Sequence, residues 1–271
     1  MLDDPKISVL MPAYNAEKYI GEAIESILNQ TFKDFEFIII DDCSTDKTWE
    51  IIQDYAKSND RIKSYQNEVN LKLALTLNKG IDYCNSKYIA RMDADDYSYP
   101  DRLGKQFNFM ENNPEIGVSG GSMNVCDQFL NVKSSREYNL TDPEIRKNIF
   151  RYSPFSHPLV IIRKEAFEEL GKYDANFNPA EDYELWFRIG ESYKLGNLKD
   201  CLLKYRVVEK SMTTGSTKRM ELKTIGIRNK YSKIYNMSFL DNCYNIAHYL
   251  SIYFIPPKFK IYLFNFLRNT K

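Results

Sequence analysis

The sequence predicts an α/β fold in which a mostly parallel sheet is flanked by helices and followed by a C-terminal helical extension. Two observations indicate this fold. Over residues 7–92, short apolar runs alternate with segments of helical periodicity. The connections between them are short, as in βαβ units. The 271 residues are enough for one large core and an appendage.

The first two strand–helix units are the clearest. Residues 7–11 form an apolar run that ends at Pro12, as a buried strand should. The helix that follows has apolar residues at helical spacing, namely Ile20, Ala23, Ile24, Ile27 and Leu28. Residues 35–40 form the second strand, and Asp46 is the expected N-cap of the next helix. That helix runs through Trp49, Ile51, Ile52 and Tyr55.

The next two units extend the pattern to residue 96. Residues 61–65 form a weaker strand, residues 71–83 a helix and residues 87–92 a further buried strand. In parallel sheets, ligands bind beyond the carboxyl ends of the strands. We therefore expect residues 12–14, 41–42 and 93–96 to converge on one cleft.

The segment Asp93-Ala94-Asp95-Asp96 is the most informative part of the chain. Its three carboxylates repel one another, and a divalent cation would relieve that repulsion because hard cations bind carboxylate oxygens. An isolated D-x-D triplet is more often a solvated acidic turn. Its position at the end of a buried strand favours a metal–diphosphate site instead.

At these motifs the chain resembles glycosyltransferase family 2, whose members have the GT-A fold with a Rossmann-like sheet. Five segments carry the resemblance in family order, over roughly residues 5–207: 8–15 (SVLMPAYN), 39–46 (IIDDCSTD), 77–81 (LNKGI), 89–96 (IARMDADD) and 180–186 (AEDYELW). The resemblance implies an inverting transferase whose donor is a nucleotide sugar, usually UDP-linked.

The resemblance also assigns the nucleotide side of the cleft. Pro12, Tyr14 and Glu17 match positions that line the nucleotide pocket. Asp42 matches the acid that accepts a hydrogen bond from the base, and Asp93 the acid beside the ribose. For Asp42, turn and helix-capping chemistry is the alternative interpretation.

The diphosphate side follows from the same segments. Asp95 matches the ligand of Mg²⁺ or Mn²⁺, which would neutralise charge on the departing nucleoside diphosphate. Asp96 is a candidate for holding the metal or positioning the sugar. Arg91 either contacts phosphate or pairs with a neighbouring acid.

Asp182 matches the catalytic base, which removes a proton from the acceptor hydroxyl during inverting transfer. The alternative is an N-cap for a helix over residues 183–193. Glu181 is a candidate for orienting the base or contacting the acceptor. His157, between the acidic segment and the base, is a candidate active-site contact, although a lone His is more often structural.

Two departures from the family pattern bear on function. The family commonly has glycine two residues after Asn70, where this chain has Lys72, and that loop lies near the donor. The Q-x-x-R-W signature of processive polymerases is absent after Asp182. We therefore expect one sugar to be transferred per encounter. We also expect residues 122–160 and the C-terminal end to recognise the acceptor.

The zero net charge hides a strong asymmetry. Residues 199–271 hold 14 Lys/Arg and 4 Asp/Glu, a net charge of +10, so residues 1–198 carry −10. The basic end is also aromatic, and Pro256-Pro257 divides it into two helical pieces too short to span a bilayer. We expect an interfacial segment for an anionic membrane surface. The alternatives are packing on the catalytic domain or a homodimer contact.

The domain organisation follows from these features. We expect a GT-A domain over residues 1–210, with a nucleotide-sugar half (1–98) and an acceptor half (99–210), and a basic extension over residues 211–271. The five cysteines lack a metal-binding pattern, and the N-terminal segment does not read as a secretory signal. The expected location is therefore the cytoplasm, peripheral on the inner face of the membrane.

The expected acceptor is a glycan or a lipid-linked oligosaccharide of a surface polysaccharide. A polyprenyl-phosphate sugar synthase and an inactive nucleotide-sugar-binding protein are the alternatives. Nucleotidyltransferases and dehydrogenases require a Gly-rich loop after the first strand, and residues 12–15 do not form one. Nucleic-acid binding is not expected, because no recognised module accompanies the basic charge.

Overall fold

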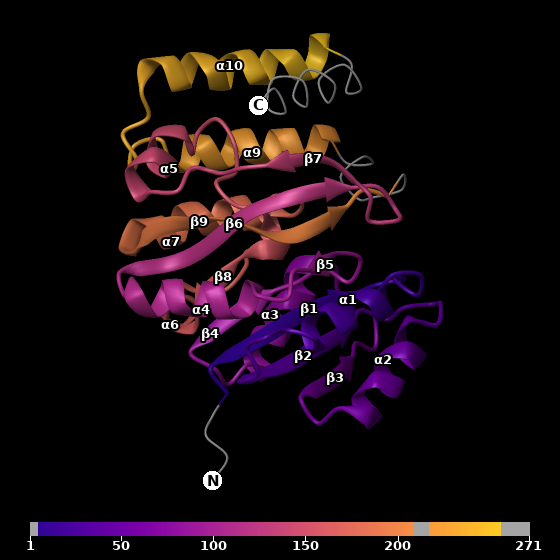
Figure 1. Ribbon diagram of the computed structural model, residues 1–271. Coiled ribbons are helices and arrows are strands. Elements are labelled where there is room, and N and C mark those ends of the chain that lie inside the picture. The colour runs from indigo at the N-terminus through magenta and orange to yellow at the C-terminus, as the bar shows by residue number, and fades with distance from the viewer. Residues whose placement is uncertain (1–4, 209–216, 256–271) are drawn as a thin grey trace.

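The computed structural model describes residues 5–208 and 217–255. Its sheet has the strand order β3-β2-β1-β4-β8-β6-β9-β5, with β7 paired to β6 (Figure 1). The first four strands pair in parallel with one another, which confirms the predicted first half: β1 (Ile7–Ala13), β2 (Phe35–Asp41), β3 (Ile62–Gln66) and β4 (Tyr88–Arg91).

The helices between these strands are α1 (Ile20–Leu28), α2 (Thr48–Ser58) and α3 (Leu73–Tyr83). The N-cap position of α2 is Lys47 rather than Asp46, although the Asp46 carboxylate accepts a hydrogen bond from the Thr48 amide at 3.0 Å. Helix α3 begins two residues later than expected. Its N-cap residue, Lys72, has φ of 69°, a conformation that favours glycine and that a helix cannot include.

Residues 97–206 add the mixed half of the sheet. Strands β5, β7 and β8 are antiparallel to their neighbours, whereas β9 runs parallel to β6. The strands are β5 (Tyr97–Ser98), β6 (Ile116–Cys126), β7 (Val132–Arg136), β8 (Ile161–Arg163) and β9 (Lys194–Arg206). The helices are α4 (Arg102–Asn112), α5 (Asp142–Asn148), η1 (His157–Leu159), α6 (Lys164–Leu170), η2 (Ala175–Phe177) and α7 (Glu181–Ser192).

Buried apolar side chains cover both faces of this sheet. On one face Ile24 of α1 and Leu103 of α4 share a cluster with Val9 of β1. On the other face Leu77 of α3 and Trp186 of α7 share a cluster with Leu10. Neighbouring residues of β1 thus point into different cores, as the alternation of a strand requires. The sheet is held from both sides, which fixes the strand ends that carry the site.

Gly80 allows α3 to approach β1 closely. A Cβ atom at this position would lie 2.3 Å from Leu10 Cδ1 and 3.0 Å from Ile40 Cδ1. Both side chains belong to the buried core. The glycine in the segment LNKGI therefore has a packing role.

The C-terminal end of the described chain forms two stacked helices. Helix α9 (Thr217–Tyr231) packs on α7 and contributes Ile227 and Tyr231 to the core. Helix α10 (Phe239–Phe254) packs on α9 and is the outermost layer (Figure 1). The expected domain boundary after residue 210 and the expected break at Pro256-Pro257 lie outside the described residues. None of the helices within 5–208 and 217–255 is long and apolar enough to cross a membrane.

Candidate active site

The acidic segment forms a compact turn between β4 and β5. Carboxylate oxygens of Asp93, Asp95 and Asp96 lie within 4.8 Å of one another. Burial, together with the neighbouring charge of Asp93, raises the pKa of Asp95 to about 6 and that of Asp96 well above its ordinary value. A carboxyl cluster of this kind binds its protons tightly unless a cation offsets its charge.

Two arginines hold this turn. Arg91 Nη2 lies 2.5 Å from Asp93 Oδ1 in an ion pair. Of the two interpretations of Arg91, pairing with a neighbouring acid is therefore the contact observed. Arg206, at the end of β9, donates from its backbone amide to Asp96 Oδ1 at 2.8 Å and from Nε to the Asp95 carbonyl at 2.6 Å. Arg206 also pairs with Glu22 of α1 at 2.5 Å. The sequence did not single out Arg206, because its partners in the acidic turn lie 110 or more residues away.

The residues of the turn fit a hard divalent cation. Oxygen donors from Asp93, Asp95 and Asp96 are the ligands that Mg²⁺ and Mn²⁺ take. Within the described part of the chain, Asp96 Oδ2 is buried and has no hydrogen-bond partner. A buried carboxylate oxygen without a donor is satisfied when a cation binds beside it.

The loops after β1 and β2 form the neighbouring wall. Tyr14 is half exposed, and Pro12 is buried within β1. Asn15 and Glu17 connect the two loops, because Thr45 N donates to Asn15 Oδ1 at 2.8 Å and Lys47 N donates to Glu17 Oε2 at 3.1 Å. The Glu17 carboxylate thus has a structural contact besides any contact with a nucleotide.

Asp42 is likewise engaged by the protein itself. Its Oδ1 accepts from Asn67 Nδ2 and from the Leu71 amide, both at 2.8 Å, and its Oδ2 accepts from the Lys72 amide at 2.9 Å. The turn-stabilising interpretation therefore applies to Asp42. A carboxylate oxygen has two acceptor directions, so Oδ2 can also take a hydrogen bond from a bound base.

Two further carboxylates open the helix α7. Ala180 is the N-cap residue of α7, and Asp182 lies in its first turn, so the N-cap interpretation of Asp182 is wrong. Burial raises the pKa of Asp182, and burial together with the charge of Asp182 raises the pKa of Glu181 to about 7. Glu181 Oε2 is buried and lacks a hydrogen-bond partner in the described ranges.

Tyr173 is buried and is influenced electrostatically by both acidic groups. Burial raises its pKa, and the hydroxyl also senses the charges of Arg91 from β4, Asp182 from α7 and Asp93 from the acidic turn. Its backbone is fixed by Asn78 of α3, which accepts from the Tyr173 amide at 2.9 Å and donates to its carbonyl at 2.8 Å. Asn78 belongs to the family segment LNKGI, whereas no sequence pattern indicates a role for Tyr173.

His157 lies in the same group of side chains. Its Nε2 is 2.9 Å from the Tyr173 hydroxyl, and its ring contacts that of Trp186 at 5.9 Å between centroids. Burial and the charge of Arg91 hold its pKa well below the usual range, so the ring is neutral. A neutral imidazole beside a phenol is suited to orienting groups.

Five of the eight buried side-chain polar atoms that lack a hydrogen-bond partner in the described ranges belong to this group of residues. They are Arg91 Nε and Nη1, Asp96 Oδ2, Glu181 Oε2 and Trp186 Nε1. Native proteins rarely leave such atoms unsatisfied, and their grouping in one place is typical of a ligand site. Fold and site together define an α/β protein with an acidic turn at a strand end, whose carboxylates could hold a cation, and a second carboxylate pair at the start of α7.

Comparisons with known proteins specify the family. Residues 8–171 match the family described as Glycosyl transferase family 2. An uncharacterized glycosyltransferase of Methanocaldococcus jannaschii is 37% identical over 225 residues, which is 82% of this chain and 77% of that protein. The O-antigen biosynthesis glycosyltransferase WbnJ of Escherichia coli is 33% identical over 252 residues, 89% of this chain and 95% of that protein. The chain belongs to glycosyltransferase family 2.

Solved structures agree on the GT-A fold. Residues 1–349 of S. aureus TarS, solved with UDP-GlcNAc, give a TM-score of 0.69 at 23% identity over 84% of this chain and 66% of that chain. The mannosyltransferase PcManGT of Pyrobaculum calidifontis, solved with GDP-Man and Mn²⁺, gives 0.66 at 17% identity over 86% of this chain and 65% of that chain. The chain spans 44% of the longer TarS chain.

Proposed function

We propose that the protein is an inverting, metal-dependent glycosyltransferase that moves one hexosyl or N-acetylhexosaminyl group from a UDP-linked donor to a hydroxyl of a glycan or lipid-linked acceptor. The observation that carries this proposal is the presence of two buried acidic groups, one in the turn at the end of β4 and one at the start of α7. Relatives named for O-antigen and teichuronic acid biosynthesis support a role in polysaccharide biosynthesis.

The donor side of the proposed mechanism uses the acidic turn. Asp95, with Asp93 and Asp96 beside it, would hold Mg²⁺ or Mn²⁺. When bound, that ion supplies positive charge to the diphosphate leaving group. Arg91 adds a fixed positive charge next to Asp93, and its two unpartnered nitrogen atoms are available to phosphate oxygens.

The acceptor side uses Asp182. Its carboxylate takes the proton from the acceptor hydroxyl as the oxygen attacks the anomeric carbon and the bond to the diphosphate breaks on the opposite face. Attack from that face inverts the anomeric configuration. Burial raises the pKa of Asp182, which makes its carboxylate a stronger base than an exposed aspartate. Glu181 and the pair of Tyr173 and His157 orient the groups around it.

The experiment that tests this function uses Asp182→Asn with a panel of UDP-sugars. We expect unchanged donor affinity and a turnover lower by about 10²–10⁴-fold, the usual contribution of a positioned general base. Turnover should also disappear in EDTA and return with Mn²⁺ or Mg²⁺. The product should be β-linked from an α-linked donor, as read by NMR. An α-linked product would contradict the mechanism, and full activity of Asp182→Asn on a polyprenyl phosphate would identify the synthase alternative.

We also propose that α10 places the enzyme on an anionic membrane surface. Helix α10 turns its polar side to the protein: Arg151 pairs with Asp241 at 3.1 Å, and Arg228 Nη1 lies 3.0 Å from His248 Nδ1. Its apolar side chains face outward, with Phe239 and Phe254 each 80% exposed, Leu240 70% and Leu250 50%. An exposed apolar helix face within a C-terminal region whose sequence carries a net charge of +10 would suit an anionic interface.

A further inference from the structure

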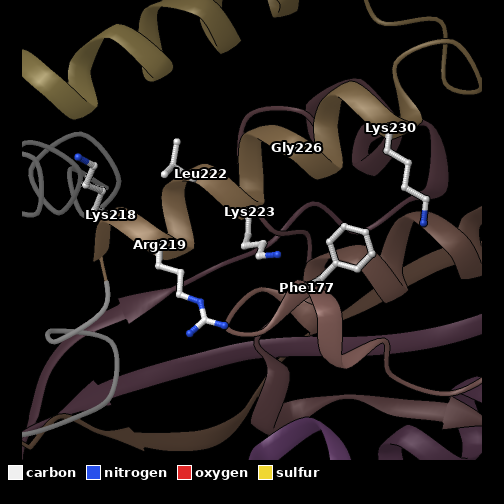
Figure 2. A pocket seen from close by; sticks show the side chains of 7 residues that line it. All are labelled: Phe177, Lys218, Arg219, Leu222, Lys223, Gly226 and Lys230. Carbon is white, nitrogen blue, oxygen red and sulfur yellow. The ribbon is translucent and has the colours of Figure 1, made fainter.

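A cationic cavity of about 770 Å³ lies between α9 and the η2 segment that precedes α7 (Figure 2). Arg219, Lys223, Gly226 and Lys230 follow one another at helical spacing and present one face of α9 to it. Figure 2 shows Arg219, Lys223 and Lys230 extending toward the side of Phe177. A Cβ atom at Gly226 would meet nothing within 4 Å, so this part of the cavity is open.

The positive charge of this cavity is only partly neutralised. Lys230 pairs with Glu184 at 2.8 Å, but the same carboxylate also pairs with Arg188 at 2.9 Å. Lys223 Nζ donates to the Asn176 carbonyl at 2.5 Å, which is an uncharged partner. Within residues 5–208 and 217–255, Arg219 has no hydrogen bond or ion pair. An anion is therefore the ligand that this surface is suited to bind.

One segment that lines the cavity is close in sequence to the proposed catalytic carboxylates. Phe177, which lines the cavity, lies four residues before Glu181 and five before Asp182. Lys223 holds the carbonyl of the neighbouring Asn176, and Lys230 lies 4.9 Å above the Phe177 ring. The η2 segment beside the cavity is therefore followed within a few residues by the proposed base.

We propose that this cavity is an acceptor subsite that binds the phosphate groups of a phosphate- or diphosphate-bearing acceptor. The inference rests on the proposed function and names its acceptor class. Arg219 supplies a fork of donors to phosphate oxygens, whereas Lys223 and Lys230 supply point charges. Phe177 adds an apolar surface for the carbon chain next to the phosphate. Lys218 lies 5.0 Å over the Tyr253 ring of α10, so the cavity borders the outward apolar helix.

The test measures binding of farnesyl diphosphate to the full-length protein by titration calorimetry in EDTA. We expect Arg219→Gln to weaken binding by about tenfold or more, because a charge-assisted contact to phosphate is lost. Inorganic pyrophosphate should lose affinity in the same variant. Lys147→Gln, an exposed lysine on α5, is the matched control and should bind as the wild type does. Asp95→Asn should also leave binding unchanged, because it alters the donor side.

Four results would overturn the proposal. The first is equal binding by Arg219→Gln and the wild type. The second is a loss of binding in Asp95→Asn, which would place the ligand at the acidic turn. Loss for farnesyl diphosphate but not for pyrophosphate would mean that the cavity recognises the carbon chain. An Arg219 effect confined to phosphatidylglycerol vesicles would assign the charge to membrane lipid. Donor hydrolysis by the wild-type protein without acceptor is measured separately, and its absence would count against the proposed function alone.

Discussion

Glu181 and Asp182 are adjacent in the chain, yet their surroundings differ. The Asp182 side chain is half-buried, whereas Glu181 is buried and has an oxygen without a partner in the described chain. Burial, followed by the charge of Asp182, raises the pKa of Glu181 to about 7. A carboxyl group that keeps its proton near neutral pH can donate a hydrogen bond, which an ionised neighbour cannot.

The raised pKa of Glu181 predicts a dependence of stability on pH. The unfolded chain loses this proton near pH 4.5 and the folded protein only near pH 7. The contribution of Glu181 to the free energy of unfolding is thus fully present below pH 4.5 and is lost as the pH rises toward 7. At pH 8, Glu181→Gln should be more stable than wild type by up to about 3 kcal/mol, at about 1.4 kcal/mol per pKa unit.

Urea denaturation at pH 5 and pH 8 measures this difference. Glu50→Gln, an exposed glutamate on α2, is the control and should leave the pH dependence as it is in wild type. An equal change in stability between the two pH values for wild type and Glu181→Gln would mean that Glu181 ionises normally.

At the scale of elements, the close packing of α3 on β1 determines where two parts of the site lie. Helix α3 carries Asn78, whose side chain fixes the backbone of Tyr173. Its N-terminal end follows the loop held by Asp42, where Lys72 adopts φ of 69°. A shift of α3 would therefore displace Tyr173 together with the loop that Asp42 holds.

Gly80→Ala tests this packing. The added methyl group would meet Leu10 Cδ1 at 2.3 Å in the core, so we expect a loss of about 1–3 kcal/mol in the free energy of unfolding. Gly226→Ala on α9 is the matched control, because its Cβ meets nothing and alanine favours a helix by about 0.5–1 kcal/mol. Thermal or urea unfolding of both variants gives the comparison. A stable Gly80→Ala protein would show that Leu10 and α3 can move apart without penalty.

At the scale of the whole molecule, charge and polarity are divided between the two ends. Residues 1–198 carry −10 and residues 199–271 carry +10, while the exposed apolar face of α10 lies on the basic end. The acidic end holds the proposed metal turn. Association with an anionic surface would therefore involve the outer helix and leave the acidic half facing away.

Co-sedimentation with liposomes tests this orientation. The double variant Leu250→Ser/Phe254→Ser on α10 should reduce binding to phosphatidylglycerol liposomes by about tenfold or more, since burying one such side chain contributes about 1.5–3 kcal/mol. Binding should also weaken at high salt. Phe129→Ser, an aromatic residue 74% exposed between β6 and β7, is the control and should bind normally. If the α10 variant instead abolishes a dimer and leaves liposome binding intact, the face is a subunit contact.

Much of the first half of the fold was predictable, because its strands and helices have strong local periodicity. Residues 7–11 and 35–40 are buried runs, and the acids of residues 93–96 follow a strand directly. Arg206 and Tyr173 were not predictable, because their roles come from contacts across about 110 and 95 residues of chain. The sequence also did not predict which side of α10 faces the protein, because the buried Asp241 and Asn245 are stabilised by partners on other elements.

The contact of Arg206 with the acidic turn has a consequence for the order in which the protein is made. Asp93, Asp95 and Asp96 leave the ribosome early, but the backbone amide and guanidinium that hold their turn come more than a hundred residues later. Until residue 206 has been synthesised and β9 has joined the sheet, the three carboxylates lack this support. A nascent or truncated chain would thus expose an acidic loop in which the proposed cation site is unfinished, and that site would be complete only after β9 has been synthesised.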